Sequence, residues 1–260
     1  MADSRLFWLA ILLSCSFSGA NILQNLYYTL HDINNISVFE KWIGYWNETY
    51  GAFAFYWFFP ILAAMPYAWT LCDEIHGGYA IQILTRSSKT DYFTGKMVSS
   101  FISGGMSIAA PLVMDILLLT MIDVTFYPQP NDLTCNTWAG SFGSLLFYKQ
   151  PALFVLLWTS VSFLWGGAIA LLCCAMGLYI KKKYVLIPSM LLIFLCEAVL
   201  SGFFRIRRRG YFVETSWLAI THAGMQNTIS ERVIFGSIFL IMGTGILLMA
   251  IKGMKRYESL

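Results

Sequence analysis

Apolar residues in this chain occur in long continuous runs, separated by shorter polar connections. A helix needs about 20 mostly apolar residues to cross the hydrocarbon core of a membrane, and only helices or closed barrels satisfy their backbone hydrogen bonds there. The runs are continuous and do not alternate as barrel strands do. Six of them are long enough to span: residues 6–26, 52–71, 97–122, 152–178, 185–204 and 233–251. The pattern therefore predicts an all-α membrane protein with six transmembrane helices, in a single domain covering residues 1–260.

Composition supports a lipid environment. Of 260 residues, 58% are hydrophobic and 12% are charged, against about 25% charged in an average soluble domain. Five of the six cysteines lie in or beside the apolar runs, and neither a Cys-x-x-Cys pair nor a His-Glu-x-x-His sequence occurs. These patterns favour neither a disulfide framework nor a metal site. We expect no metal, no bound cofactor and no nucleic-acid partner for this chain.

Lys and Arg residues in short connections favour the cytoplasmic side of a membrane. With both termini inside, more of them lie on the inner side than on the outer side. We therefore expect a multi-pass protein of a bacterial plasma membrane with both termini cytoplasmic. The main exception is the sequence "RIRRR", an outer basic cluster made of Arg205, Arg207, Arg208 and Arg209. Either these residues anchor an outer cap through carboxylates such as Asp123, Glu214 and Glu231 or through lipid phosphates, or they contact an anionic substrate group.

Polar residues inside the apolar runs are costly in hydrocarbon, so they should face protein or water. One set lies in the first run at i, i+4, i+7 and i+11 spacing, which places the side chains on one face of a helix. Two acidic residues lie in later runs. Both structural hydrogen bonding and a substrate route remain open for these positions. The candidates for a translocation path are Ser14, Ser18, Asn21, Asn25, Asp115 and Glu197.

Small residues repeat at four-residue intervals in two of the runs. Ser99, Ser103 and Ser107 lie in the third run, and Gly166, Ala170 and Cys174 lie in the fourth. Small side chains at this spacing allow two helix backbones to approach closely in a membrane. We interpret both sets as packing surfaces and not as sites of chemistry.

The longest inner connection reads "DEIHGGYAIQILTRSSKTDYFTGK" and joins the second and third runs. Asp73 and Glu74 follow the membrane exit directly, and the Gly77-Gly78 pair allows a bend. A short helix over residues 79–86 would bring Tyr79, Ile81 and Leu84 together as an apolar face. Such a helix could dock into a soluble partner or lie on the lipid surface, and the pattern alone does not separate these alternatives.

Residues 65–96, "MPYAWTLCDEIHGGYAIQILTRSSKTDYFTGK", resemble the most recognisable segment of the ABC-2 type permeases, the membrane subunits of ATP-driven exporters. The shared features are an acid after the second helix, a glycine, a Leu-Leu-Thr-Arg-like run, an aromatic residue and Gly-Lys at the start of the third helix. In this chain they fall at Glu74, Gly78, Ile83-Leu84-Thr85-Arg86, Tyr92 and Gly95-Lys96. The number of spans, the length and the placement of the termini are also similar.

The resemblance implies that residues 79–86 form a coupling helix that sits in a cleft of an ATP-binding subunit. The implied ATPase-coupling residues are Asp73, Glu74, Gly78, Tyr79, Ile83, Leu84, Thr85, Arg86 and Tyr92. The chain contains no Gly-x-x-x-x-Gly-Lys-Ser/Thr loop, so ATP and Mg²⁺ would bind to the partner ATPase. A second permease subunit, identical or related, would complete the transport path. The implied activity is export of a hydrophobic or amphipathic molecule, such as a peptide, drug or lipid.

Two outer connections are too long for simple turns. Residues 123–151 contain "WAGSFGSLLFY", a candidate short helix, and residues 205–231 contain "GYFVETSWLAITHAGMQN", which is apolar enough to return toward the membrane. Relatives in the resembled family often have short re-entrant helices at the second place. Two other classes of function stay open: an intramembrane enzyme, for which we find no catalytic constellation, and a passive membrane anchor or receptor.

Overall fold

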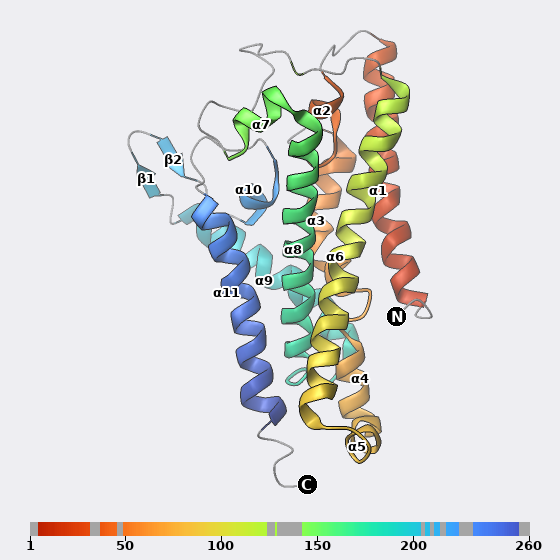
Figure 1. Ribbon diagram of the computed structural model, residues 1–260, viewed down its shortest axis with the longest axis vertical. Coiled ribbons are helices and arrows are strands. Elements are labelled where there is room, and N and C mark those ends of the chain that lie inside the picture. Colours follow the sequence, from red (N-terminus) through yellow and green to blue (C-terminus); the bar gives the residue numbers. More distant parts are fainter. Residues whose placement is uncertain are drawn as a thin grey trace.

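The computed structural model describes residues 5–31, 37–45, 49–123, 128, 142–203, 206–208, 211–213, 217–223 and 231–254. Over these residues the chain forms helices and one short hairpin, joined by turns and irregular segments (Figure 1). Five helices are long and apolar enough to cross a membrane. They are α1 (Arg5–Leu30), α6 (Lys89–Ile122), α8 (Pro151–Met176), α9 (Lys183–Phe203) and α11 (Glu231–Leu248), the last continued by the π-helical turn η1 (Met249–Met254). The predicted all-helical class is thus confirmed, and five of the six predicted runs form helices that are long and apolar enough to cross a membrane.

The second predicted span is wrong as a continuous helix. Helix α3 (Tyr50–Ala64) has 15 residues, or roughly 22 Å of length, which is shorter than the ~30 Å hydrocarbon core. Residues 65–69 form turns, and the chain then resumes as α4 (Thr70–His76). Pro66 lies within this break and has no backbone N–H to donate to a continuing helix. Proline does not always end a helix in this chain, because Pro60, Pro111 and Pro188 lie inside helices.

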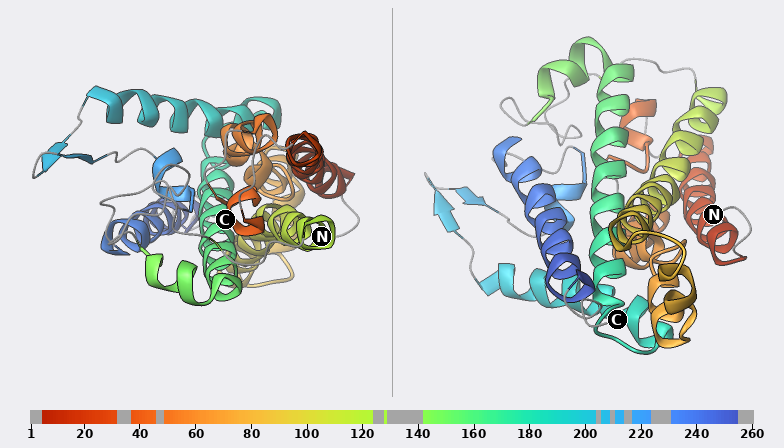
Figure 2. Two further views of the ribbon diagram at one scale, coloured as in Figure 1. Left: turned by 90° about the horizontal axis from the view of Figure 1, so that it is seen from above. Right: turned by 60° about the horizontal axis from the view of Figure 1, so that its bottom comes forward.

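Helices α6 and α8 pack side by side at the centre of the bundle, with α1 and α3 on one side and α11 on the other (Figure 1). Figure 2 shows α9 lying across the bundle, steeply inclined to α8. Helix α6 has 34 residues, or roughly 51 Å of length. It is therefore longer than the hydrocarbon core is thick, and it links the two ends of the molecule.

Glycine permits the close approach of α6 and α8. A Cβ atom on Gly104 would lie 2.3 Å from the Cβ of Ala170 and 2.9 Å from the carbonyl oxygen of Gly166. The predicted small residues Ser103, Ser107, Ala170 and Cys174 are buried. The interpretation of these small residues as a packing surface agrees with this geometry.

Short elements lie at both ends of the long helices. The upper end of Figure 1, where α1 and α6 finish, carries α2 (Val38–Lys41) and α7 (Ser144–Lys149), and the lower end carries α4 and α5 (Tyr79–Leu84). Helix α7 overlaps the second half of the predicted "WAGSFGSLLFY" helix and extends one residue beyond it, while the first residues of that stretch lie outside the described residues. Helix α10 (Trp217–Thr221) packs against α8 and α9, so this segment does return to the bundle as predicted.

Two of the four residues of the outer basic cluster, Arg207 and Arg208, lie on a hairpin that the sequence pattern did not predict. Strands β1 (Ile206–Arg208) and β2 (Tyr211–Val213) pair antiparallel, with Arg207 opposite Phe212 and Arg208 opposite Tyr211. Arg205, Arg209 and Glu214 lie outside the described residues. Both interpretations of the cluster, as an anchor or as a substrate contact, stay predictions.

Candidate functional site

The predicted coupling segment forms a sharp elbow at the lower end, which we define as residues 70–88. Helix α4 ends at Gly77, whose N–H donates to the carbonyl of Asp73 at 2.8 Å. Gly78 follows with a φ of 77°, a left-handed conformation that glycine adopts without steric cost. The chain then forms α5, and the Ser88 hydroxyl caps α6 by accepting from the Asp91 N–H at 3.1 Å. The predicted bend at the double glycine is confirmed.

Glu74 fastens the elbow to the first turns of α6. Its carboxylate accepts from the Lys96 ammonium at 2.5 Å and from the Tyr92 hydroxyl at 2.6 Å. Lys96 also donates to the Tyr67 hydroxyl at 3.1 Å. Both members of the ion pair are mostly shielded from solvent, so the pair is stronger than an exposed one would be. The structure thus brings two predicted coupling residues, Glu74 and Tyr92, into direct contact.

Asp73 fastens the elbow to α9. Its carboxylate accepts from the Lys183 ammonium at 2.7 Å, and Lys183 is the first residue of α9. The neighbouring Cys72 thiol donates to the carbonyl of Ile180 at 3.0 Å. Burial, together with the Asp73 charge, raises the pKa of the Cys72 thiol, while Lys183 opposes this shift. The elbow is therefore tied to two long helices through charged or polar contacts.

The two sides of α5 differ from the predicted apolar face. Ala80, Ile83 and Leu84 follow i, i+3, i+4 spacing, and this stripe faces the lower core, where Ala80 is buried and the other two are partly buried. Tyr79 and Ile81 are instead 57% and 49% exposed. The predicted grouping of Leu84 with Tyr79 and Ile81 is therefore wrong, because Leu84 packs against the protein.

Thr85 and Arg86 are exposed after the last turn of α5. Thr85 caps this turn, since its N–H donates to the carbonyl of Ile81 at 3.2 Å. Sequence reasoning missed Lys183 and the bond from Lys96 to Glu74. In the sequence, the only hint of these two pairs was that lysines occur on the inner segments next to Asp73 and Glu74.

A second polar cluster lies between the upper halves of α1 and α6. Asp115 is fully buried and accepts from the Ser18 hydroxyl at 3.0 Å, from the Asn21 amide at 3.1 Å and from the Ile43 N–H at 2.8 Å. Four polar residues on one face of α1 are all buried: Ser14, Ser18, Asn21 and Asn25. The predicted polar face of α1 thus points into the protein, and the structure joins it to Asp115.

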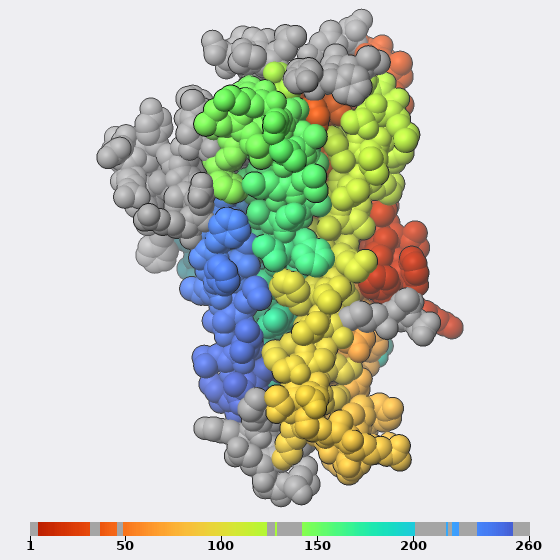
Figure 3. All heavy atoms as spheres, in the orientation of Figure 1, coloured from red at the N-terminus to blue at the C-terminus, as the bar shows by residue number. Residues whose placement is uncertain are grey.

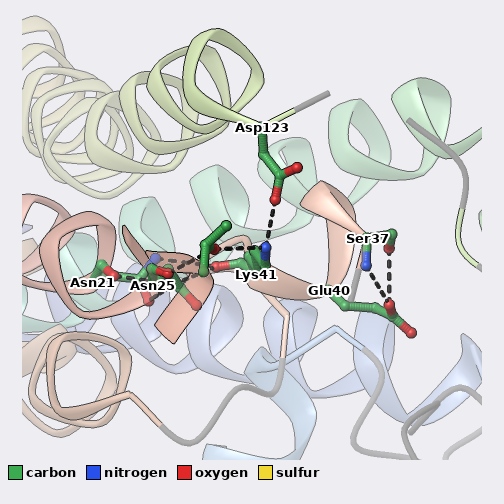
Figure 4. Close-up of polar contacts among 7 residues, drawn as sticks. Asn21, Asn25, Ser37, Glu40, Lys41 and Asp123 are labelled. Atoms are coloured by element: carbon green, nitrogen blue, oxygen red, sulfur yellow. Dashed lines mark hydrogen bonds and ion pairs between the residues drawn. The ribbon is translucent and has the colours of Figure 1, made fainter. Parts of the chain in front are cut away.

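Lys41 closes this cluster at its upper edge. Its ammonium donates to the Thr29 hydroxyl at 3.0 Å and forms an ion pair with Asp123 (Figure 4). Its carbonyl accepts from the amides of Asn21 and Asn25, each at 3.2 Å. Sequence reasoning had considered Asp123 as a partner for the outer arginines. In the structure Asp123 binds Lys41, a residue that had not been considered.

Glu197 lies apart from the Asp115 cluster. It is partly buried on α9, and its carboxylate accepts from the Trp217 N–H at 3.1 Å. Trp217 is the first residue of α10. Glu197 therefore accepts a hydrogen bond from one of the N–H groups that have no partner within that helix. The six candidates for a translocation path therefore do not form one group.

Comparison with known proteins identifies no relative: no family model, no curated protein and no solved structure matches this chain. Among the described residues, no three His, Cys, Asp or Glu side chains are grouped as a metal site. The polar groups described above bond to one another and build two structural centres, one at each end of α6. The exposed side of the elbow carries Tyr79 and Ile81.

Proposed function

We propose that this chain is the membrane subunit of an ATP-driven exporter of the ABC-2 type. A separate subunit with a phosphate loop binds ATP and Mg²⁺, and a second permease subunit completes the transport path. The observation that carries this proposal is the elbow, which is bonded firmly to α6 and α9 while it leaves Tyr79 and Ile81 exposed. A surface that receives force from an ATPase needs both properties.

The position of the elbow favours a soluble partner over the lipid surface. It lies well below the start of α1 in Figure 1, and in Figure 3 it forms the lower right corner of the visible face together with the first turns of α6. Its exposed side mixes the apolar Tyr79 and Ile81 with the polar Gln82 and Arg86. An interfacial helix would bury a continuous apolar face in lipid, but the apolar stripe of α5 is turned toward the protein.

The proposed direction and cargo follow from the family resemblance together with the charge pattern. Both termini and the elbow lie on the cytoplasmic side, and the cargo is a hydrophobic or amphipathic molecule. Closure of the ATPase would push the elbow, and the pairs Glu74–Lys96 and Asp73–Lys183 would pass the displacement to α6 and α9. Helix α6 reaches the opposite end of the molecule, so a displacement of its first turns would also move its far end.

Purification of the tagged chain from the membranes of its natural host tests this proposal. We expect a polypeptide with a phosphate loop to co-purify, together with ATP hydrolysis. Ile81→Asp and Tyr79→Asp should each remove both, because they place a charge in an apolar contact. Tyr184→Asp is the matched control, since Tyr184 also belongs to the lower end and is 82% exposed. If no such polypeptide co-purifies, or if it binds all variants equally, the proposal is wrong.

A further inference from the structure

We propose that two connections at the upper end together form a plug that closes the helix bundle, and that Asp115 is the residue that locks it. The plug consists of residues 37–45, which follow α1, and residues 217–223, which precede α11. The closure itself follows from the contacts described below. Its opening during a transport cycle rests on the proposed function.

The first part of the plug is sunk between the long helices. Trp42, Ile43 and Tyr45 are at most 1% exposed, although they belong to a connection with no long helix of its own. The Trp42 indole donates to the carbonyl of Leu112 at 2.9 Å, and the Ile43 N–H donates to Asp115. A buried backbone N–H needs an acceptor, and Asp115 supplies it from within α6.

The second part of the plug is interlocked with the first. The Ala223 N–H donates to the carbonyl of Gly44 at 3.0 Å, and Tyr45 and Ala223 are partners in a parallel β-bridge. The Tyr56 hydroxyl donates to the same Gly44 carbonyl at 3.2 Å, and the His222 ring packs on the Tyr56 ring with centroids 3.4 Å apart. Two connections that are far apart in sequence thus behave as one body.

The chemistry under the plug suits a contact that opens. A contact that never opens would be at least as stable with well-packed apolar side chains in place of buried charge. Here the groups beneath the plug are the carboxylate of Asp115 and the amides of Asn21 and Asn25, and the plug itself contributes the buried ion pair of Lys41 with Asp123. Each of these polar groups is well solvated once water enters, so the polar contacts lose little when the plug separates. The cost of opening lies instead in the apolar side chains of Trp42, Ile43 and Tyr45, which then become exposed.

Asp115 decides the position of the plug because it joins three segments. It binds Ser18 and Asn21 on α1 and Ile43 on the plug, while it belongs to α6 itself. In Asp115→Asn the new amide group has two donors and one acceptor. It therefore cannot accept from all three donors, and the plug should open more often.

One test measures access to the space beneath the plug. In the purified chain in lipid nanodiscs, Ser18→Cys should react slowly with a charged maleimide. In the Asp115→Asn background this reaction should be at least tenfold faster. Asp91→Asn is the matched control, because Asp91 lies on the same helix at the opposite end, and it should change nothing. Peptide mass spectrometry separates position 18 from the native cysteines. Rapid labelling without Asp115→Asn, or equal rates with and without it, would overturn the proposal.

A second test does not depend on the Asp115 variant folding. Tyr45→Cys combined with Ala223→Cys should form a disulfide on mild oxidation, because the Cα atoms of β-bridge partners lie within disulfide reach. Neither single variant should form it. Failure of the pair to cross-link in the folded chain would contradict the interlocked plug. Neither test uses ATP or a partner subunit, so the outcome of each is independent of the proposed function.

Discussion

At the scale of single residues, each end of the molecule contains a buried lysine that forms an ion pair with an acidic residue. Lys96 is buried at the lower end with Glu74, and Lys41 is buried at the upper end with Asp123. A buried ammonium is tolerated only with a partner, and removing one member of such a pair leaves the other charge unpaired in a medium of low dielectric constant. The two pairs are therefore more sensitive to single substitutions than the exposed charges of the same chain.

Lys96→Met should lower the free energy of unfolding by roughly 2–3 kcal/mol, since Glu74 then stays shielded without its cation. Combining it with Glu74→Gln should recover most of this loss, because the glutamine is neutral and still accepts from Tyr92. The measurement is the unfolding midpoint of the purified chain in detergent. Lys89→Met, on the same helix but less buried, is the control and should change little. Equal losses in the single and double variants would contradict the pairing.

Sequence predicted the orientation of residues better than their partners. The buried face of Ser14, Ser18, Asn21 and Asn25 was predictable because helical spacing is a local property. That Asp115 would bind this face was not predictable, since their contact depends on how α1 and α6 pack. The same holds for Asp73, whose bond to Lys183 joins residues 110 positions apart.

At the scale of elements, the central contact is the crossing of α6 and α8, which Gly104 makes possible. A Cβ atom there would lie 2.3 Å from Ala170 and 2.8 Å from the carbonyl oxygen of Ala63. Neither neighbour can move without shifting a helix backbone. The close packing of α6 against α8 therefore requires a residue without a side chain at position 104.

Gly104→Ala should destabilise the fold by about 1–3 kcal/mol through overpacking. Gly95→Ala on the same helix should be neutral or stabilising by up to about 1 kcal/mol, because a Cβ atom at Gly95 meets nothing within 4 Å. Thermal unfolding of both purified variants measures the difference. A Gly104→Ala variant as stable as Gly95→Ala would show that the two helices have room to separate.

The elements also show where the hydrophobic pattern stops being informative. Continuous apolar runs identified five long helices, but the run over residues 52–71 hid the break after α3. Hydropathy averages over a window and does not register where the hydrogen bonding of a helix is interrupted. The hairpin of β1 and β2 was missed for a related reason, because strands of three residues are too short for a period to emerge.

At the scale of the whole molecule, the two ends have different proposed tasks. The lower end carries the elbow and the upper end carries the plug, with α6 running between them. The proposed orientation places the elbow in the cytoplasm. The function and the direction of transport both depend on this assignment.

Thiol labelling in intact cells should report this orientation. In a Cys135→Ser background, a membrane-impermeant maleimide should label Tyr50→Cys, since Tyr50 is 82% exposed near the upper end. It should label Ser88→Cys in the elbow only after the cells are permeabilised. The background chain without an added cysteine controls for the native thiols. The reverse pattern would place the elbow outside the cell and remove the basis for coupling.

Photo-cross-linking from the elbow can show whether an ATPase subunit contacts it. A benzophenone amino acid at position 81 should form an adduct with a polypeptide that carries a phosphate loop, in native membranes and without purification. The same group at position 184, also exposed at the lower end, should not. This result is expected because Ile81 faces away from the protein on a segment that is bonded to α6 and α9. Adducts with lipid alone at position 81 would contradict the account and identify the elbow as a membrane-surface element.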